Sequence, residues 1–258
     1  MSTATPPVNP LHPPPPAKYT GRIPNTALAA STVSFILGSL FSLGFFTFVA
    51  GLSNNGLNHT GVWSWWTTPH LAFFAAAWSF FHWDEYAVTV GWNFDKSSVD
   101  SFLLENGSLY HIAHSVSIIE YLVTLFFFPG FKSLYPQWLA GIGLVLVLGG
   151  QTLRSCAMIH AATNFSHAVA FRKRDDHILV TTGVYAYLRH PSYTGFFWWA
   201  VGTQIVLGNP ISVVGYMVVM WRFFYYRIKA EERALVVFFG KDYEEYRKRV
   251  GTWIPFVP

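Results

Sequence analysis

The residues best suited to chemistry gather in the last third of the chain. Arg189 and His190 precede Pro191, and Ser192 and Tyr193 follow it. Proline is favoured in the first turn of a helix, so we expect a helix to begin at Pro191 with Arg189 or His190 at its cap. The free N–H groups and partial positive charge of such a start suit a carboxylate or a phosphate. The alternative is an ordinary helix start at the level of the lipid headgroups.

A second polar cluster contains Arg227, Lys229, Glu231, Glu232 and Arg233. Arg227 and Glu231 are four residues apart, so a helix presents them on one face. A solvated, salt-bridged helix end is the alternative interpretation. Ionisable groups beside a membrane segment are costly, however, and several of them together favour a functional site.

Metal binding is not expected. His111, His114 and Glu120 lie in one apolar run, but no H-E-x-x-H pattern is present. Hydrogen bonds between helices explain these residues better. The single cysteine, Cys156, excludes a disulfide framework and a thiolate cluster. His82, Asp84 and Glu85 are interpreted as the cytosolic end of another helix.

The elements that must position these residues belong in a bilayer. The chain of 258 residues is 52% hydrophobic and 12% charged, with 11 Trp and 24 Phe, which a soluble domain could not bury. The net charge of +4 is too small to indicate nucleic acid. The composition therefore predicts an all-α polytopic membrane protein. We expect about six transmembrane helices, in the apolar runs 27–52, 69–91, 108–128, 135–160, 192–207 and 211–226.

Three regions are expected. Residues 1–24 form a Pro-rich disordered tail. Residues 25–162 form an N-terminal region of four spans, in which Gly141, Gly143, Gly149 and Gly150 permit close helix packing. Residues 163–258 form the catalytic region, which consists of a cofactor segment, a two-span hairpin turning at Asn209-Pro210 and cytosolic C-terminal helices.

The distribution of Lys and Arg predicts the orientation. If the N-terminus is cytosolic, the connections 53–66, 129–134 and 208–210 lie on the far side, and they contain a single basic residue, Lys132. Both termini and the segment 161–190 are then cytosolic. Asn58 begins a glycosylation sequon on the luminal side.

Several motifs carry a resemblance to a known family. Residues 176–191 read D-H-I-L-V-T-T-G-V-Y-A-Y-L-R-H-P, and R-I-K-A-E-E, F-F-G-K-D-Y-E-E-Y and G-T-W-I-P-F follow. The segment S-F-F-H-W-D-E-Y lies upstream. Together they resemble the isoprenylcysteine carboxyl methyltransferase family in its short, six-span form. The resemblance covers about residues 70–258 and is most specific in the C-terminal ninety.

The resemblance implies an enzyme of the endoplasmic reticulum membrane. It would methylate the C-terminal carboxylate of farnesyl- or geranylgeranyl-cysteine in C-a-a-X-processed proteins such as Ras-like GTPases. S-adenosylmethionine would be the donor. Matching positions imply Arg227 and Glu231 as catalytic residues, with Arg227 facing the substrate carboxylate. The implied cofactor-binding residues are His177, Ile178, Leu179, Val180, Tyr185, His190, Pro191, Ser192, Tyr193 and Glu231.

Methyl transfer to a carboxylate requires alignment more than proton transfer. A C-terminal carboxyl group has a pKa of about 3.5 and is already ionised at neutral pH. The segments 161–193 and 227–258, which flank the last hairpin, are expected to fold over it as a cofactor lid. Two alternatives remain open at this point. One is an NADPH-dependent membrane sterol reductase, whose chain end is similar, and the other is a non-enzymatic membrane scaffold or transporter.

Overall fold

The computed structural model describes residues 22–53, 68–170 and 172–257. It confirms an all-α architecture, because these residues form no strand and only one isolated bridge, between Leu188 and Gly251. The helices are α1 (Ala27–Ser53), α2 (Pro69–Trp92), α3 (Ser108–Phe127), α4 (Pro129–Ser133), α5 (Gln137–Ala161), α6 (Pro191–Leu207), α7 (Pro210–Phe239) and α8 (Lys241–Arg249). Short 3₁₀ turns lie at Phe94–Lys96, Val99–Phe102, Ala162–Asn164 and Gly183–Ala186. The sequon at Asn58 and residues 1–21 of the predicted tail lie outside the described residues.

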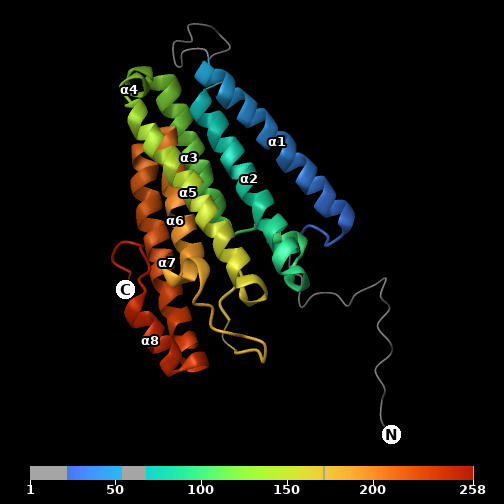
Figure 1. Cartoon of the computed structure of the whole chain (residues 1–258). Helices are drawn as coiled ribbons and strands as arrows, with labels where there is room; N and C mark the ends of the chain where they lie inside the picture. The colour runs from blue at the N-terminus through green and yellow to red at the C-terminus, as the bar shows by residue number, and fades with distance from the viewer. Residues whose placement is uncertain (1–21, 54–67, 171, 258) are drawn as a thin grey trace.

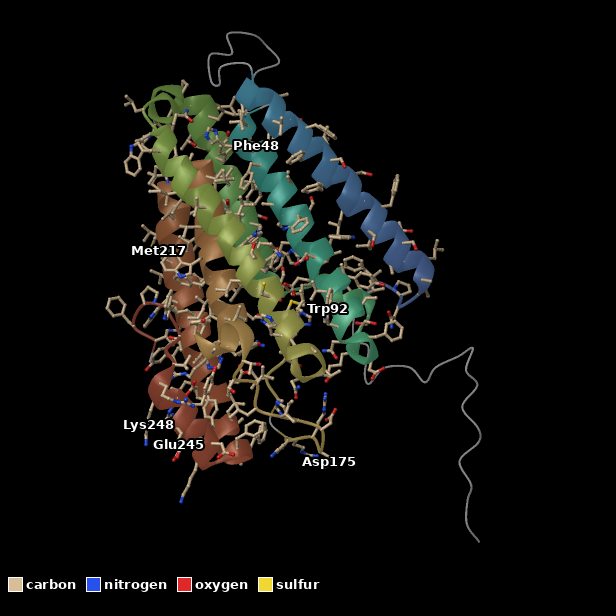
Figure 2. The ribbon with its side chains drawn as sticks, in the orientation of Figure 1. Phe48, Trp92, Asp175, Met217, Glu245 and Lys248 are labelled. Carbon is tan, nitrogen blue, oxygen red and sulfur yellow. The ribbon has the colours of Figure 1, made fainter. Side chains whose placement is uncertain are left out.

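The long helices run side by side in one bundle (Figure 1). Helix α1 lies at the outer edge and packs along α2, whereas α5, α6 and α7 pack together on the other side. The end of α1, the start of α2, α4 and the turn between α6 and α7 share one end of the bundle. The segment after α5 and helix α8 lie at the opposite end, where charged side chains such as Asp175, Glu245 and Lys248 gather (Figure 2).

The predicted count of six spans is not confirmed. All six apolar runs form helices, but among the described residues three are long and apolar enough to cross a membrane: Ala27–Leu52, Ser108–Phe127 and Gln137–Asn164. Helix α6 has 17 residues, which is short for a span. Helices α2 and α7 carry ionisable side chains within or beside their apolar runs, and these lower their hydropathy.

Two pairs of glycines bring α5 and α6 together. A Cβ atom added to Gly150 would lie 2.5 Å from the carbonyl oxygen of Gly195, and one added to Gly143 would lie 2.9 Å from that of Gly202. The other two glycines predicted to serve packing, Gly141 and Gly149, have no such neighbour within 4 Å. Backbone contact through small residues is the usual means of tight helix packing in lipid.

The hairpin of α6 and α7 begins and turns where the sequence predicts. Pro191 is the first residue of α6, with His190 at its N-cap, and Pro210 is the first residue of α7. Glu120 of α3 caps α7, because its two carboxylate oxygens accept the N–H groups of Ile211 at 2.9 Å and Ser212 at 2.7 Å. The predicted hydrogen bonding between helices is thus found at Glu120, and the described residues hold no group of potential metal ligands.

The interpretation of His82, Asp84 and Glu85 as a helix end is wrong. Helix α2 continues to Trp92, and both His82 and Glu85 are completely buried. His82 bonds to Tyr110 at 2.6 Å through its ring. The cause is tertiary: these side chains face partners on neighbouring helices, which the local pattern cannot reveal.

Candidate active site

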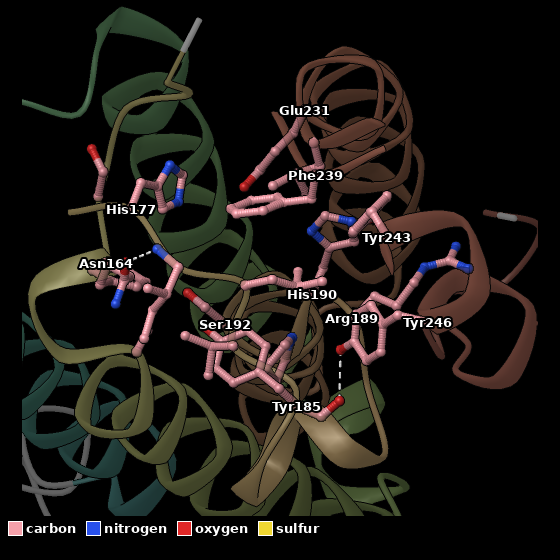
Figure 3. Close-up of a pocket in the computed structure, with 18 of the residues that line it drawn as sticks. Asn164, His177, Tyr185, Arg189, His190, Ser192, Glu231, Phe239, Tyr243 and Tyr246 are labelled. Carbon is pink, nitrogen blue, oxygen red and sulfur yellow. Dashed lines mark hydrogen bonds between the residues drawn. The ribbon is translucent and has the colours of Figure 1, made fainter. Parts of the chain in front are cut away.

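A cavity lies at the charged end of the bundle and opens to solvent (Figure 3). Its walls come from the end of α5 and the segment 164–166, the irregular segment 177–180, the start of α6, the second half of α7 and α8. All of these lining residues come from the two segments predicted to close over the last hairpin, 161–193 and 227–258.

Every residue predicted to hold the cofactor lines this cavity. They come from separate stretches of the chain and meet in one place: His177, Ile178, Leu179, Val180, Tyr185, His190, Pro191, Ser192, Tyr193 and Glu231. Arg227 is not part of the lining. It lies one helical turn before Glu231 on α7 and contacts the lining residue Tyr193.

Arg227, Tyr193 and Glu231 form a continuous hydrogen-bonded line. The Nε of Arg227 donates to the Tyr193 hydroxyl at 2.9 Å, and that hydroxyl donates to Oε2 of Glu231 at 2.6 Å. The guanidinium also lies over the Tyr193 ring, 5.2 Å from its centroid, and its Nη2 donates to the carbonyl oxygen of His167. The line places the anionic Glu231 in the wall and the cationic Arg227 beside the wall.

His190 is held by a carboxylate that the sequence analysis did not assign to the site. Its Nε2 bonds to Oε1 of Glu232 at 2.9 Å, and the same oxygen accepts the Tyr243 hydroxyl at 2.7 Å. Arg189 forms an ion pair with it at 3.1 Å. Burial alone raises the pKa of Glu232, but the hydrogen bonds from His190 and Tyr243 and the nearby charges of His190 and Arg189 together outweigh burial, so the pKa lies below its ordinary value of 4.5. Glu232 follows the apolar half of α7 and fixes the position of His190.

The variant Glu232→Gln is expected to unfold at a lower temperature than the wild type at neutral pH. Because the folded-state pKa of Glu232 is depressed, its stabilising contribution is present above pH 4.5 and is lost as the pH falls through the folded-state pKa. The gap in unfolding temperature between wild type and variant should therefore be full above pH 4.5 and shrink below it. Thermal unfolding in detergent across this pH range measures the gap, and a gap that does not change with pH would contradict the assignment.

The opposite wall is the irregular segment that begins at His177. The N–H of Ile178 donates to Oδ1 of Asn164 at 3.0 Å, which ties the segment to the end of α5 (Figure 3). The ring of His177 meets the ring of Phe239 edge-on at 5.3 Å. Burial and the nearby positive charges, Arg174 foremost, lower the pKa of His177. This wall is therefore aromatic and aliphatic, with a neutral imidazole at neutral pH.

Tyr185 closes the floor of the cavity. Its backbone oxygen accepts the Tyr246 hydroxyl of α8 at 2.6 Å (Figure 3), and its own hydroxyl donates to the Ala157 oxygen at 3.3 Å. Burial raises the pKa of Tyr185, so its hydroxyl stays protonated at neutral pH. Gly183 precedes it with φ +60°, a conformation that favours glycine.

Sequence reasoning also missed Arg154, which lies under the cavity. Its Nη1 donates to Oγ of Ser192 at 3.0 Å, and its Nη2 donates to Oε2 of Glu85 at 2.8 Å. The available signal was a charged residue inside the apolar run 135–160.

Comparisons with known proteins agree with this geometry. The sequence profile described as "Isoprenylcysteine carboxyl methyltransferase (ICMT) family" matches residues 142–237, which include most of the cavity wall. The protein-S-isoprenylcysteine O-methyltransferase of Saccharomyces cerevisiae is 48% identical over 188 residues, which cover 71% of this chain and 79% of that protein. The Schizosaccharomyces pombe protein of that name is 39% identical over 253 residues, which cover 91% of this chain and 98% of that protein.

The chain belongs to the isoprenylcysteine carboxyl methyltransferase family.

A solved structure of the isoprenylcysteine carboxyl methyltransferase family has the same fold. The "eukaryotic intramembrane Ras methyltransferase ICMT" matches with a TM-score of 0.76 and 33% identity, covering 89% of this chain and 82% of that one. The chain spans less than two thirds of the Xenopus laevis family member, which is 48% identical over 62% of its length. The resemblance inferred from the motifs is confirmed. The reductase and the scaffold or transporter alternatives gain no support.

Proposed function

We propose that this protein methylates the C-terminal carboxylate of a prenylated cysteine and uses S-adenosylmethionine as the methyl donor. The observation that carries the proposal is the single cavity in which the predicted cofactor residues meet, with Arg227 bonded to its wall. Its membership of the methyltransferase family supplies the reaction class.

The residues around the cavity suit the donor. S-adenosylmethionine supplies an electrophilic methyl group on a cationic sulfonium, with a zwitterionic amino-acid end. The first turn of α6, with His190 at its cap, suits the carboxylate of that end because the start of a helix carries a partial positive charge. Ile178, Leu179 and Phe239 provide an apolar wall for the adenine ring. Glu231 supplies negative charge for the sulfonium.

Arg227 orients the acceptor. Its Nε and Nη2 are engaged by Tyr193 and by the carbonyl oxygen of His167, and within the described part of the chain its Nη1 has no hydrogen-bond partner. Nη1 can therefore bind one oxygen of the substrate carboxylate and leave the other oxygen to attack. The acceptor is already ionised, so no residue has to remove a proton. Arg227 and Glu231 thus act through alignment and charge.

The membrane topology is part of the proposal. We place six helices at membrane depth, with α2, α6 and α7 beside the three apolar ones, and both termini and the cavity on the cytosolic side of the endoplasmic reticulum. Support comes from the scarcity of Lys and Arg in the connections 53–66, 129–134 and 208–210 and from the charged side chains at the end of the bundle that holds the cavity. Each buried CH₂ of a prenyl chain contributes ~0.8 kcal/mol to its partitioning into lipid. The site must therefore open to lipid for the substrate and to water for the donor.

A direct assay tests the function. Protein in lipid vesicles is mixed with methyl-labelled S-adenosylmethionine and a farnesylcysteine analogue, and base-labile methyl ester is counted. Transfer is expected with the analogue and not with its methyl ester, which has no free carboxylate. Processed Ras-like GTPases and other prenylated proteins are the substrates to be tested next. Absence of transfer from folded protein to farnesyl- and geranylgeranyl-cysteine alike would refute the proposal.

A further inference from the structure

We propose that Glu85, which does not line the cavity, is a positioning residue for both the donor side and the acceptor side of the active site. Its carboxylate holds Arg154 and His167, and these two residues fix Ser192 in the cofactor pocket and the guanidinium of Arg227. This inference rests on the proposed methyl transfer, because it assigns the two halves to donor and acceptor.

Glu85 is completely enclosed by its partners. Its side chain is 0% exposed, in the interior of the bundle. Arg154 of α5 binds both carboxylate oxygens, Oε1 through Nε and Oε2 through Nη2 at 2.8 Å. Nε2 of His167 donates to Oε2 at 2.9 Å. One carboxylate therefore joins α2, α5 and the segment after α5.

The first branch leads to the acceptor side. The carbonyl oxygen of His167 accepts Nη2 of Arg227, while the ring of the same residue is held by Glu85. The adjacent chain is also fastened to α2 and the turn after it, because the Phe165 carbonyl accepts Asn93 Nδ2 at 3.0 Å and Lys96 Nζ at 2.7 Å. When the His167 ring is anchored, its carbonyl holds the guanidinium in one orientation. Glu85 thus determines where Nη1 of Arg227 points.

The second branch leads to the donor side. Nη1 of Arg154 donates to Oγ of Ser192 at 3.0 Å, and Ser192 lines the cavity at the start of α6. The Arg154 guanidinium lies over the rings of Phe81 and Phe196, at 5.4 and 5.2 Å from their centroids. Aromatic faces and a bidentate carboxylate leave this guanidinium little freedom. The position of the Ser192 hydroxyl is consequently fixed by Arg154.

The neighbouring carboxylate, Asp84, provides a contrast. It accepts Gln151 Nε2 at 2.9 Å and Ser155 Oγ at 2.5 Å, both on α5. Neither of these partners lines the cavity or contacts Arg227. Asp84 therefore joins α2 to α5 through residues that do not line the cavity, and Asp84→Asn is a matched control for a polar contact between the same two helices.

The test separates positioning from simple stability by measuring KM and kcat for each substrate in vesicles. His167→Ala removes the ring bond to Glu85 but keeps the backbone carbonyl. We expect its kcat/KM for the farnesylcysteine analogue to fall roughly 10- to 100-fold, as for a misplaced reacting group. Its KM for S-adenosylmethionine should stay within about twofold of wild type, because the Arg154–Ser192 branch is intact. His167→Gln, whose amide can donate to Glu85, should recover most of the loss, and Asp84→Asn should match wild type in both constants.

A second measurement tests whether His167 affects the reaction through Arg227. In an Arg227→Lys background, which lacks the fork bound by the His167 carbonyl, adding His167→Ala should cost little further activity. Glu85→Gln should impair both halves, but it leaves Arg154 buried without a counter-charge and can fail to fold, so the His167 variants decide.

Two outcomes would overturn the inference while leaving the function intact. One is a His167→Ala enzyme with wild-type constants beside an active wild type. The other is an equal rise of both KM values together with a lower unfolding temperature, the pattern of a purely structural pair. Absence of transfer by the wild type itself would overturn the function and this inference together.

Discussion

Arg227→Ala is expected to lower kcat for methyl transfer by about 10²–10³-fold, the usual cost of removing one preorganised donor at a reacting oxygen. The structure gives the reason. The guanidinium is held by Tyr193 and the His167 carbonyl beside the cavity. The arginine that lines the cavity, Arg189, is instead engaged by Glu232 and by the carbonyl oxygens of Arg247 and Val250, so it is not placed to replace Arg227. Label transfer per mole of folded protein, at saturating donor, measures the effect.

Two variants on the same helix serve as controls for Arg227. Arg227→Lys keeps the charge but loses the planar fork, so we expect an intermediate loss. Arg222→Ala removes an exposed arginine that lies over the ring of Tyr226 and does not line the cavity, and its activity should remain at the wild-type level. Wild-type turnover by Arg227→Ala would reject the role of this residue.

Gly150→Ala is expected to destabilise the protein more than any other single methyl addition in α5. The new Cβ would lie 2.5 Å from the Gly195 oxygen and 2.7 Å from the Trp199 nitrogen, both backbone atoms of α6 that cannot move independently. The two helices must separate, and we expect a loss at or above the upper end of the ~1–3 kcal/mol typical of overpacking. Because α6 begins at the cavity, activity should fall with stability. Thermal unfolding in detergent and label transfer measure the two effects.

The matched control is the preceding residue. A Cβ on Gly149 meets no atom within 4 Å, so Gly149→Ala adds the same methyl group to the same helix without a clash. It should even favour the helix by up to about 1 kcal/mol. Equal unfolding temperatures for the two variants would show that the close contact between α5 and α6 is not what limits stability.

The sequence was sufficient to predict the helices, because an apolar run of the right length has one solution in lipid. Pro191 and Pro210 were recognised as helix starts for an equally local reason, the fixed φ of proline. Ten residues of the cavity wall were predicted through the resemblance, and no local physical rule identified His177 or Tyr185. Their place in the cavity depends on how the segment after α5 turns back over α7 and α8.

Long-range pairing explains what the sequence could not reveal. Glu85 and Arg154 lie in different helices and meet only because α2 packs on α5. Glu231 and Glu232 are adjacent, yet one bonds to Tyr193 and the other to His190, because successive residues on a helix point about 100° apart. When two adjacent residues are charged, the sequence alone does not indicate which of them faces the site.

The hydropathy of the helices fails to confirm the predicted number of spans for the same reason. A hydropathy measure treats every side chain as if it faced lipid, whereas His82 and Glu85 in α2 face the interior of the bundle. The helices outside the three candidate spans include α2, α6 and α7, which carry or support the site. The helices that satisfy the measure include α1 and α3, whose apolar windows are 11% buried within the protein.

The peripheral place of α1 has a consequence for how members of this family can diverge. Helix α1 packs on α2 and the turn at Val99–Phe102, far from the cavity (Figure 1). Nearly any apolar substitution on its outer face should leave the rate of the reaction unchanged. Selection there therefore preserves hydrophobicity rather than residue identity. Additional helices can be gained at this edge during evolution without disturbing the residues around the cavity. Divergence between relatives should therefore be steepest at α1 and should fade towards α6.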